Sequence, residues 1–205
     1  MIKYISKLSF LTNIFFICVL ICFKSYAENI TSNNTLVMLG EDNAPVKIKV
    51  FSSLTCPHCA SFHMEVVPKI KKKYIDSGKV QLIFIDFPLD QAAFNASKLL
   101  HCLNNKKKIA YLDIIYENQE KWASGSSLEE INKKLKKIVE SLGISSDKFN
   151  KCLNDEIIGN KILANRIDGQ RKYSINSTPT IIINEKKLED SVSFKNISKK
   201  IEKLI

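Results

Sequence analysis

The sequence lacks several features that would indicate other kinds of protein. It has no internal repeat and no low-complexity linker, which excludes a solenoid and a string of loosely joined modules. Its 205 residues fit one domain, or one domain with an insertion, and leave no room for a second enzyme domain. A zinc site could use residues near the first cysteine pair: Cys56, His58, Cys59 and His63. The sequence has no second closely spaced Cys or His pair that would complete the tetrahedral set of ligands. We expect no metal and no cofactor.

The basic stretches also lack interleaved aromatic residues, which proteins that bind single-stranded nucleic acid use as stacking platforms. The formal net charge is +10, but the lysines are spread over stretches with helical periodicity. We therefore expect a solvated basic surface and no nucleic-acid partner.

The first 27 residues have the pattern of a secretory signal peptide. Lys3 and Lys7 precede a mostly apolar run over 10–23, which is too short to span a bilayer comfortably. The triplet Ser25-Tyr26-Ala27 suits cleavage after Ala27, and removal of this segment lowers the charge to +7. We expect an exported protein; the alternative is an uncleaved membrane anchor.

Cleavage would leave four cysteines, an even number that suits an oxidising compartment: Cys56, Cys59, Cys102 and Cys152. Four cysteines allow three pairings. The short spacing of Cys56 and Cys59 leaves Cys102 and Cys152 as a second pair, which we expect to form a structural disulfide. The alternatives for this second pair are a redox role or two free thiols.

The apolar pattern predicts an α/β protein with a helical insertion. A short edge strand over 36–39 precedes a strand over 46–51, a helix from Cys59 to about 77 and a strand over 80–87, which form a βαβ unit. Pro68 should bend or interrupt the helix. Helices are expected near 91–103, 107–121, 128–142, 146–153 and 157–172, then a strand over 180–184 and a helix over 194–204.

The run Cys56-Pro57-His58-Cys59 lies where the first strand of that unit passes into its helix. The free N–H groups and the positive end of the helix dipole favour a thiolate on Cys56, so we expect an exposed, acidic sulfur there. Pro57 suits the first helical turn, and a protonated or hydrogen-bonding His58 would add to the effect. Hydroxyls in 52–55 should cap the helix, and Cys59 should be the buried resolving partner.

Thr178-Pro179 precedes the late strand. A cis bond at Pro179 would turn the chain beside the cysteines and leave the Thr178 backbone free to pair with an extended substrate. The alternative is an ordinary proline at the start of a strand.

These motifs together resemble the DsbA family of bacterial periplasmic disulfide oxidases. The resemblance is carried by Cys56-Pro57-His58-Cys59, by Asp86-Phe87-Pro88-Leu89-Asp90 and by Thr178-Pro179-Thr180, and covers nearly all of the chain from Leu36. It implies a thioredoxin fold in two parts, 36–89 and 173–205, with an inserted all-helical domain over 90–172. It also implies donation of the Cys56–Cys59 disulfide to reduced exported proteins in the periplasm, and reoxidation by a quinone-linked membrane partner.

Two positions depart from the pattern of such proteins. Val50 stands where related proteins often bury an acid beneath the cysteines, and Thr178 stands where a valine is also found. Threonine there also occurs in isomerase and reductase relatives, so these activities stay open as alternatives. Related isomerases usually carry an added dimerisation domain, for which the mature chain has no room before its first strand; we therefore expect a monomeric oxidase. A chaperone or binding module without catalytic activity is the remaining alternative.

Overall fold

A computed structural model describes residues 36–205, and the expected signal peptide lies outside these residues. The described chain contains a five-stranded mixed sheet in the order β1-β3-β2-β4-β5. The strands are β1 (Val37–Leu39), β2 (Val46–Ser52), β3 (Val80–Asp86), β4 (Thr180–Ile183) and β5 (Lys186–Lys187). β2 and β3 are parallel, while the other neighbours are antiparallel. This sheet and its helices confirm the predicted α/β fold with a helical insertion.

One long helical segment connects β2 to β3. It consists of α2 (Pro57–Ser61), the π-helical η1 (Phe62–Val66), α3 (Val67–Ile70) and the π-helical η2 (Lys71–Ile75). Pro68 lies in the first turn of α3, directly after η1. Proline cannot donate a backbone hydrogen bond to the preceding turn, and the winding changes from π to α beside it. The segment continues as helix to Ile75, so Pro68 does not interrupt it.

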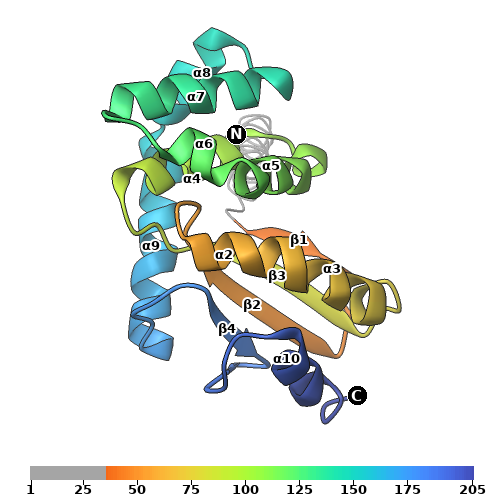
Figure 1. The fold of residues 1–205 in the computed structure, drawn as a ribbon. Coiled ribbons are helices and arrows are strands. Elements are labelled where there is room, and N and C mark those ends of the chain that lie inside the picture. Colours follow the sequence, from red (N-terminus) through yellow and green to blue (C-terminus); the bar gives the residue numbers. More distant parts are fainter. Residues whose placement is uncertain (1–35) are drawn as a thin grey trace, which may run out of the picture. The chain divides into compact units, whose positions relative to one another are not determined.

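Six helices lie between β3 and β4 and form the insertion (Figure 1). They are α4 (Gln91–Cys102), α5 (Asn105–Glu117), α6 (Gln119–Ala123), α7 (Leu128–Ser141), α8 (Ser146–Leu153) and α9 (Glu156–Tyr173). The single helix expected over 107–121 is wrong, because the chain breaks at Asn118 into α5 and α6. The helix α10 (Phe194–Ile201) ends three residues earlier than expected, and the short β5 was not expected.

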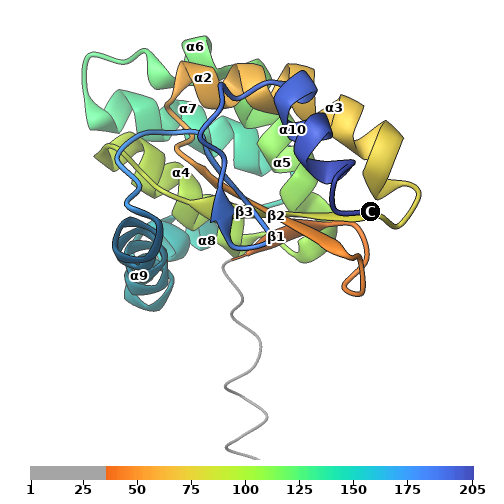
Figure 2. The same ribbon diagram turned by 90° about the horizontal axis from the view of Figure 1, so that it is seen from below.

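The sheet has a hydrophobic core on each face. Alternate residues of β2 and β3 point to opposite faces, so that Ile48, Val50 and Leu82 belong to the larger core and Phe51 and Ile83 to the smaller one. α2, α3 and α10 lie on one side of the sheet (Figure 2). On the smaller core, α9 approaches closely at Gly169, where a Cβ would lie 2.6 Å from the Phe51 ring.

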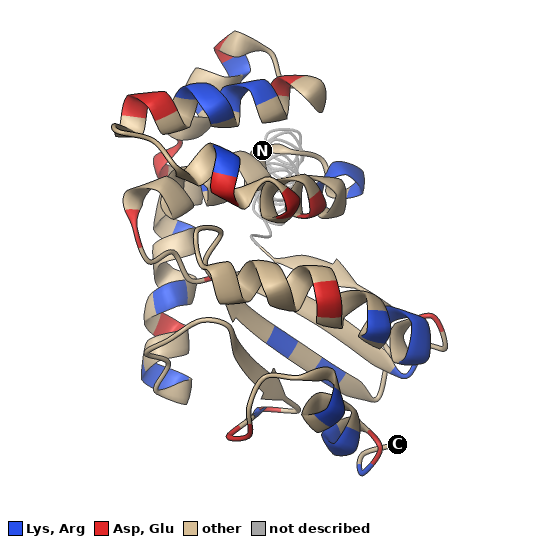
Figure 3. Cartoon of the chain, in the orientation of Figure 1, with Lys and Arg blue, Asp and Glu red and all other residues tan. Residues whose placement is uncertain are grey.

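Lysine and arginine residues are distributed over α7, α9, α10 and the end of the β2–β3 connection (Figure 3). Several pair with carboxylates, among them Lys134 with Glu130 and Lys172 with Glu185. None of the described helices is long and apolar enough to span a bilayer.

Cys102 and Cys152 form a disulfide that joins the end of α4 to α8, with their Cα atoms 6.0 Å apart. The loop that it closes spans 50 residues and contains α5, α6 and α7. The bond therefore connects distant parts of the insertion and leaves Cys56 and Cys59 as free thiols.

We predict that replacing both Cys102 and Cys152 with serine lowers the free energy of unfolding by about 4 kcal/mol, because the unfolded chain gains the entropy of an open 50-residue loop. Urea unfolding would measure the difference between the protein with the Cys102–Cys152 bond and the double serine variant, both in a Cys56→Ser/Cys59→Ser background. Equal midpoints would show that the bond contributes nothing to stability.

Candidate active site

Cys56 occupies the N-cap position of α2. Its backbone is extended, with φ −81° and ψ 118°, and Pro57 follows as the first helical residue. The Cys56 carbonyl accepts hydrogen bonds from the N–H groups of Cys59 at 3.0 Å and Ala60 at 3.2 Å. The sulfur therefore lies at the end of the helix where unpaired N–H groups favour a negative charge.

The expected capping by hydroxyls of 52–55 is wrong, because α2 has no side-chain cap. Ser53 Oγ and Thr55 Oγ1 lie 3.1 Å apart, and Thr55 Oγ1 donates to Asp90 Oδ2 at 2.6 Å. Ser53 Oγ also accepts from the Leu89 N–H at 3.3 Å. These hydroxyls bind the start of the insertion instead of the helix.

The two thiols differ strongly in acidity. A hydrogen bond from the Cys59 thiol lowers the pKa of Cys56 to about 5 despite the opposing effect of burial, with further contributions from the Thr178 side chain and the N–H groups of Cys59 and His58. The pKa of Cys59 is raised by its interaction with Cys56 and by burial. The geometry thus favours an anion on the first sulfur and a neutral thiol on the second.

The expectation of an exposed sulfur on Cys56 is wrong in degree. Cys56 is 8% exposed and Cys59 1% exposed, so both are largely covered. Part of the covering comes from Thr178, whose carbonyl accepts a hydrogen bond from Cys56 Sγ at 3.3 Å. The Thr178 segment therefore lies directly against the Cys56 sulfur.

The Thr178-Pro179 peptide bond is cis, and the segment lies beside the cysteines. The Thr178 carbonyl bonds Cys56, while its buried Oγ1 has no hydrogen-bond partner of normal geometry. The Thr178 side chain nevertheless lowers the pKa of both thiols. This bond needs the proton of the Cys56 thiol, so the Thr178 carbonyl is engaged with Cys56 only while that sulfur is protonated.

His58 is exposed and acts on Cys56 through its backbone N–H. Its side chain helps to line a pocket of about 380 Å³ beside the redox pair. The lining residues come from the helix after Cys56, from the Thr178-Pro179 turn and from the loop before α10: His58, Ser61, Phe62, Glu65, Val66, Thr178, Pro179 and Val192.

The structure adds Gln119, at the start of α6, to the predicted residues. Its Nε2 donates to the carbonyls of Leu54 at 2.8 Å and Cys56 at 3.1 Å. Tyr116 is also buried near the pair, where Cys59 contributes to raising its pKa, although burial is the largest cause. No spacing or motif indicated either residue, because both reach the site by tertiary packing across 60 residues of sequence.

Val50 is buried beneath the site, so the strand supplies no acid there. His63 and His101 are buried beside carboxylates: His63 Nε2 lies 2.7 Å from Asp113 Oδ1, and His101 Nε2 contacts Asp86. Within residues 36–205, no group of three or more His, Cys, Asp and Glu side chains could hold a metal ion. Both histidines therefore form hydrogen bonds with carboxylates, and burial lowers the pKa of His63.

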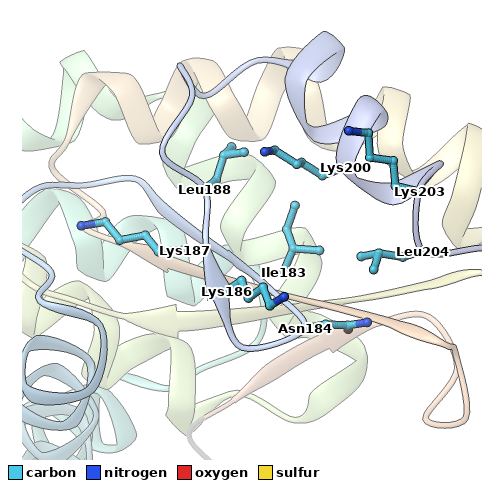
Figure 4. A pocket seen from close by; sticks show the side chains of 8 residues that line it. All are labelled: Ile183, Asn184, Lys186, Lys187, Leu188, Lys200, Lys203 and Leu204. Atoms are coloured by element: carbon cyan, nitrogen blue, oxygen red, sulfur yellow. The ribbon is translucent and has the colours of Figure 1, made fainter.

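Another pocket, of about 410 Å³, lies away from the cysteines at the far end of β4 (Figure 4). Ile183, Leu188 and Leu204 give it an apolar lining, and four lysines surround it: Lys186, Lys187, Lys200 and Lys203. No thiol lines this pocket, so it lies outside the redox site.

The chain is similar in sequence and in structure to several known proteins. A family model described as thioredoxin matches residues 32–203. The probable disulfide bond formation protein D of Bacillus cereus is 30% identical over 199 residues, which cover 87% of this chain and 89% of that protein. A crystal structure of Wolbachia pipientis alpha-DsbA1 is 31% identical, with a TM-score of 0.75, and the match covers 82% of this chain and 90% of that one.

Some relatives are longer than this chain. The putative protein-disulfide oxidoreductase RT0103 of Rickettsia typhi is 30% identical over 174 residues, which cover 84% of this chain but 63% of that protein. The chain thus spans less than two thirds of the length of this relative.

We predict that the Cys56 thiolate in the reduced protein titrates with a midpoint near pH 5. Because the pKa of Cys56 lies below the value of about 8.5 for an unfolded cysteine, ionisation of Cys56 stabilises the reduced fold, and this contribution is complete above about pH 8.5. This stabilisation is lost as the pH falls through 5. Thiolate absorbance at 240 nm and urea unfolding between pH 4 and 9 would show both effects; a Cys56→Ser variant should show neither.

We predict that Thr178→Val, which removes the hydroxyl and keeps the side-chain shape, raises the pKa of Cys56 by about one unit through loss of one stabilising interaction. The matched variant Thr180→Val removes a hydroxyl of the same turn that donates to the Ser177 carbonyl. It should leave the Cys56 titration unchanged. An unaltered midpoint in Thr178→Val would contradict the assigned effect of the hydroxyl.

Proposed function

The chain belongs to the thioredoxin family, among its DsbA-like members, and from this premise we propose that it is a thiol–disulfide oxidoreductase that donates its Cys56–Cys59 disulfide to exported proteins. The observation that carries the proposal is the difference in acidity between the two sulfurs. A stabilised Cys56 thiolate favours the reduced pair, and a protein with a stable reduced pair gives its disulfide away readily.

The proposed reaction has two exchange steps. A substrate thiolate attacks Cys56 Sγ, the Cys56–Cys59 bond breaks, and Cys59 leaves with the electron pair and takes up a proton. A second substrate thiolate then attacks the substrate sulfur of the mixed disulfide and releases Cys56 as a thiolate. The substrate loses two electrons and the protein gains them. The low pKa of Cys56 makes it the better leaving group in the second step.

The pocket beside the redox pair supports a protein substrate. It combines apolar surface from Phe62, Val66 and Val192 with the carboxylate of Glu65, and ends at the Thr178-Pro179 turn. An extended segment of a reduced chain could lie along this turn, placing a cysteine over Cys56. Substrates are then selected by an accessible cysteine in unfolded chain rather than by a folded surface.

The remaining parts of the proposal concern the setting. Lys3, Lys7 and the apolar run before Ala27 support export to the periplasm by a cleaved signal peptide. Each turnover leaves a reduced pair, so continued donation needs an oxidant, which we propose is a quinone-linked membrane partner. The protein is proposed to act as a monomer.

A reductase or isomerase activity on the same pair is the second candidate. It is favoured by Thr178, whose hydroxyl is buried next to the sulfurs and can alter the balance between oxidised and reduced forms. The two candidates differ in the equilibrium of the pair with glutathione, because about 30 mV corresponds to 1.4 kcal/mol.

We predict that the pair equilibrates with glutathione as an oxidant. In Cys59→Ser, oxidised glutathione first converts Cys56 into a mixed disulfide with glutathione; a thiolate of a reduced, unfolded protein then attacks Cys56 Sγ, releases glutathione and accumulates as a mixed disulfide with Cys56. Removal of Cys59 blocks the internal attack that would resolve the complex. Mass spectrometry of the complex and a titration against glutathione buffers would test both results, with Cys56→Ser as the control that forms no complex. A strongly reducing equilibrium would overturn the direction proposed here.

A further inference from the structure

The loop between β2 and α2, residues 53–56, is held by the helical insertion on two sides. From the start of the insertion, Asp90 accepts from Thr55 Oγ1 at 2.6 Å and the Leu89 N–H donates to Ser53 Oγ at 3.3 Å. From α6, Gln119 Nε2 donates two hydrogen bonds to backbone carbonyls of the same loop. The loop that carries Cys56 is therefore fixed by elements that follow it in sequence.

Gln119 has the most direct position of these partners. It is 6% exposed, and one nitrogen reaches the carbonyls of Leu54 and Cys56 at 2.8 and 3.1 Å. These two carbonyls lie on either side of Thr55, so the amide fixes the chain direction as it enters α2. A buried amide that satisfies two buried carbonyls is costly to remove, and its geometry is accordingly well defined.

The Cys56 carbonyl is also the first acceptor of α2, since the N–H groups of Cys59 and Ala60 point to it. Gln119 thus holds the same peptide group that starts the helix. The orientation of this group decides whether the Cys56 side chain lies over the helix N-terminus, where the N–H groups of His58 and Cys59 stabilise a negative sulfur.

We propose that Gln119 is a positioning residue for the redox reaction: it holds Cys56 at the N-terminus of α2 and thereby stabilises its thiolate, so that the helical insertion controls the chemistry of the pair. This inference rests on the proposed function and adds a residue and a mechanism to it. Gln119 does not contact the substrate sulfur and acts only through the backbone of the loop.

The test compares two buried glutamines. Gln119→Met removes the donor and keeps the length of the side chain, and Gln119→Asn keeps an amide that is one methylene shorter. The matched control is Gln81→Met, because Gln81 is 3% exposed, donates to Asp42 and accepts from Lys47 Nζ at 3.0 Å, with no bond to the loop. The thiolate titration is measured on reduced proteins at a temperature where circular dichroism shows each to be folded.

We expect Gln119→Met to raise the midpoint of the Cys56 titration by about one unit, and to shift the equilibrium with glutathione about tenfold towards the disulfide. Gln119→Asn should shift both in the same direction by less. Gln81→Met should lower the melting temperature but keep the wild-type midpoint.

The inference would be overturned if the Cys56 thiolate of both Gln119 variants titrated at the same pH as in the wild-type protein, whatever their melting temperatures. An equal shift in Gln81→Met would also overturn it, since the change would then follow from lost stability alone. If the wild-type protein itself titrates near the ordinary thiol value, the proposed function fails and the role of Gln119 fails with it. A low wild-type midpoint that Gln119→Met leaves unchanged refutes the inference alone.

Discussion

The chemistry of this protein depends on where one peptide group lies. The Cys56 carbonyl begins α2, and the sulfur on the same residue lies at the helix N-terminus, where the N–H groups of Cys59 and His58 favour a negative charge. Cys59, one turn further along, meets the opposite conditions, because it is more deeply buried and faces the sulfur that prefers the charge. A separation of three residues thus produces two thiols of very different acidity without any charged side chain between them.

The rest of the fold serves this arrangement. The parallel pairing of β2 with β3 brings Ser52 opposite Asp86. The loop before the cysteines and the start of the insertion therefore both follow the carboxyl ends of neighbouring strands, at the same end of the sheet. The insertion returns through α9 to β4, which places Thr178 against Cys56. The sheet is therefore a rigid support from which three separate segments converge on one pair of sulfur atoms.

Much of this arrangement follows from local sequence signals. The periodicity over 80–87 and 180–184 predicts the central strands, and Cys56-Pro57-His58-Cys59 predicts the junction where the thiols lie. Local signals fail where the partner is distant. The hydroxyls of Ser53 and Thr55 suit a helix cap by sequence, but Asp90 and the backbone of Leu89 compete for them in the folded chain. Gln119 and Tyr116 lie in a stretch whose sequence indicates only helix, and only packing against the β2–α2 loop gives them a place in the site.

The disulfide between Cys102 and Cys152 has a consequence for the life of the molecule. Making it removes two electrons and two protons from a newly synthesised chain, and the bond connects helices that are 50 residues apart. Each new copy therefore requires an oxidant before its insertion is complete. If older copies donate disulfides as proposed, an unfolded new copy with these two thiols has the features of the proposed substrates.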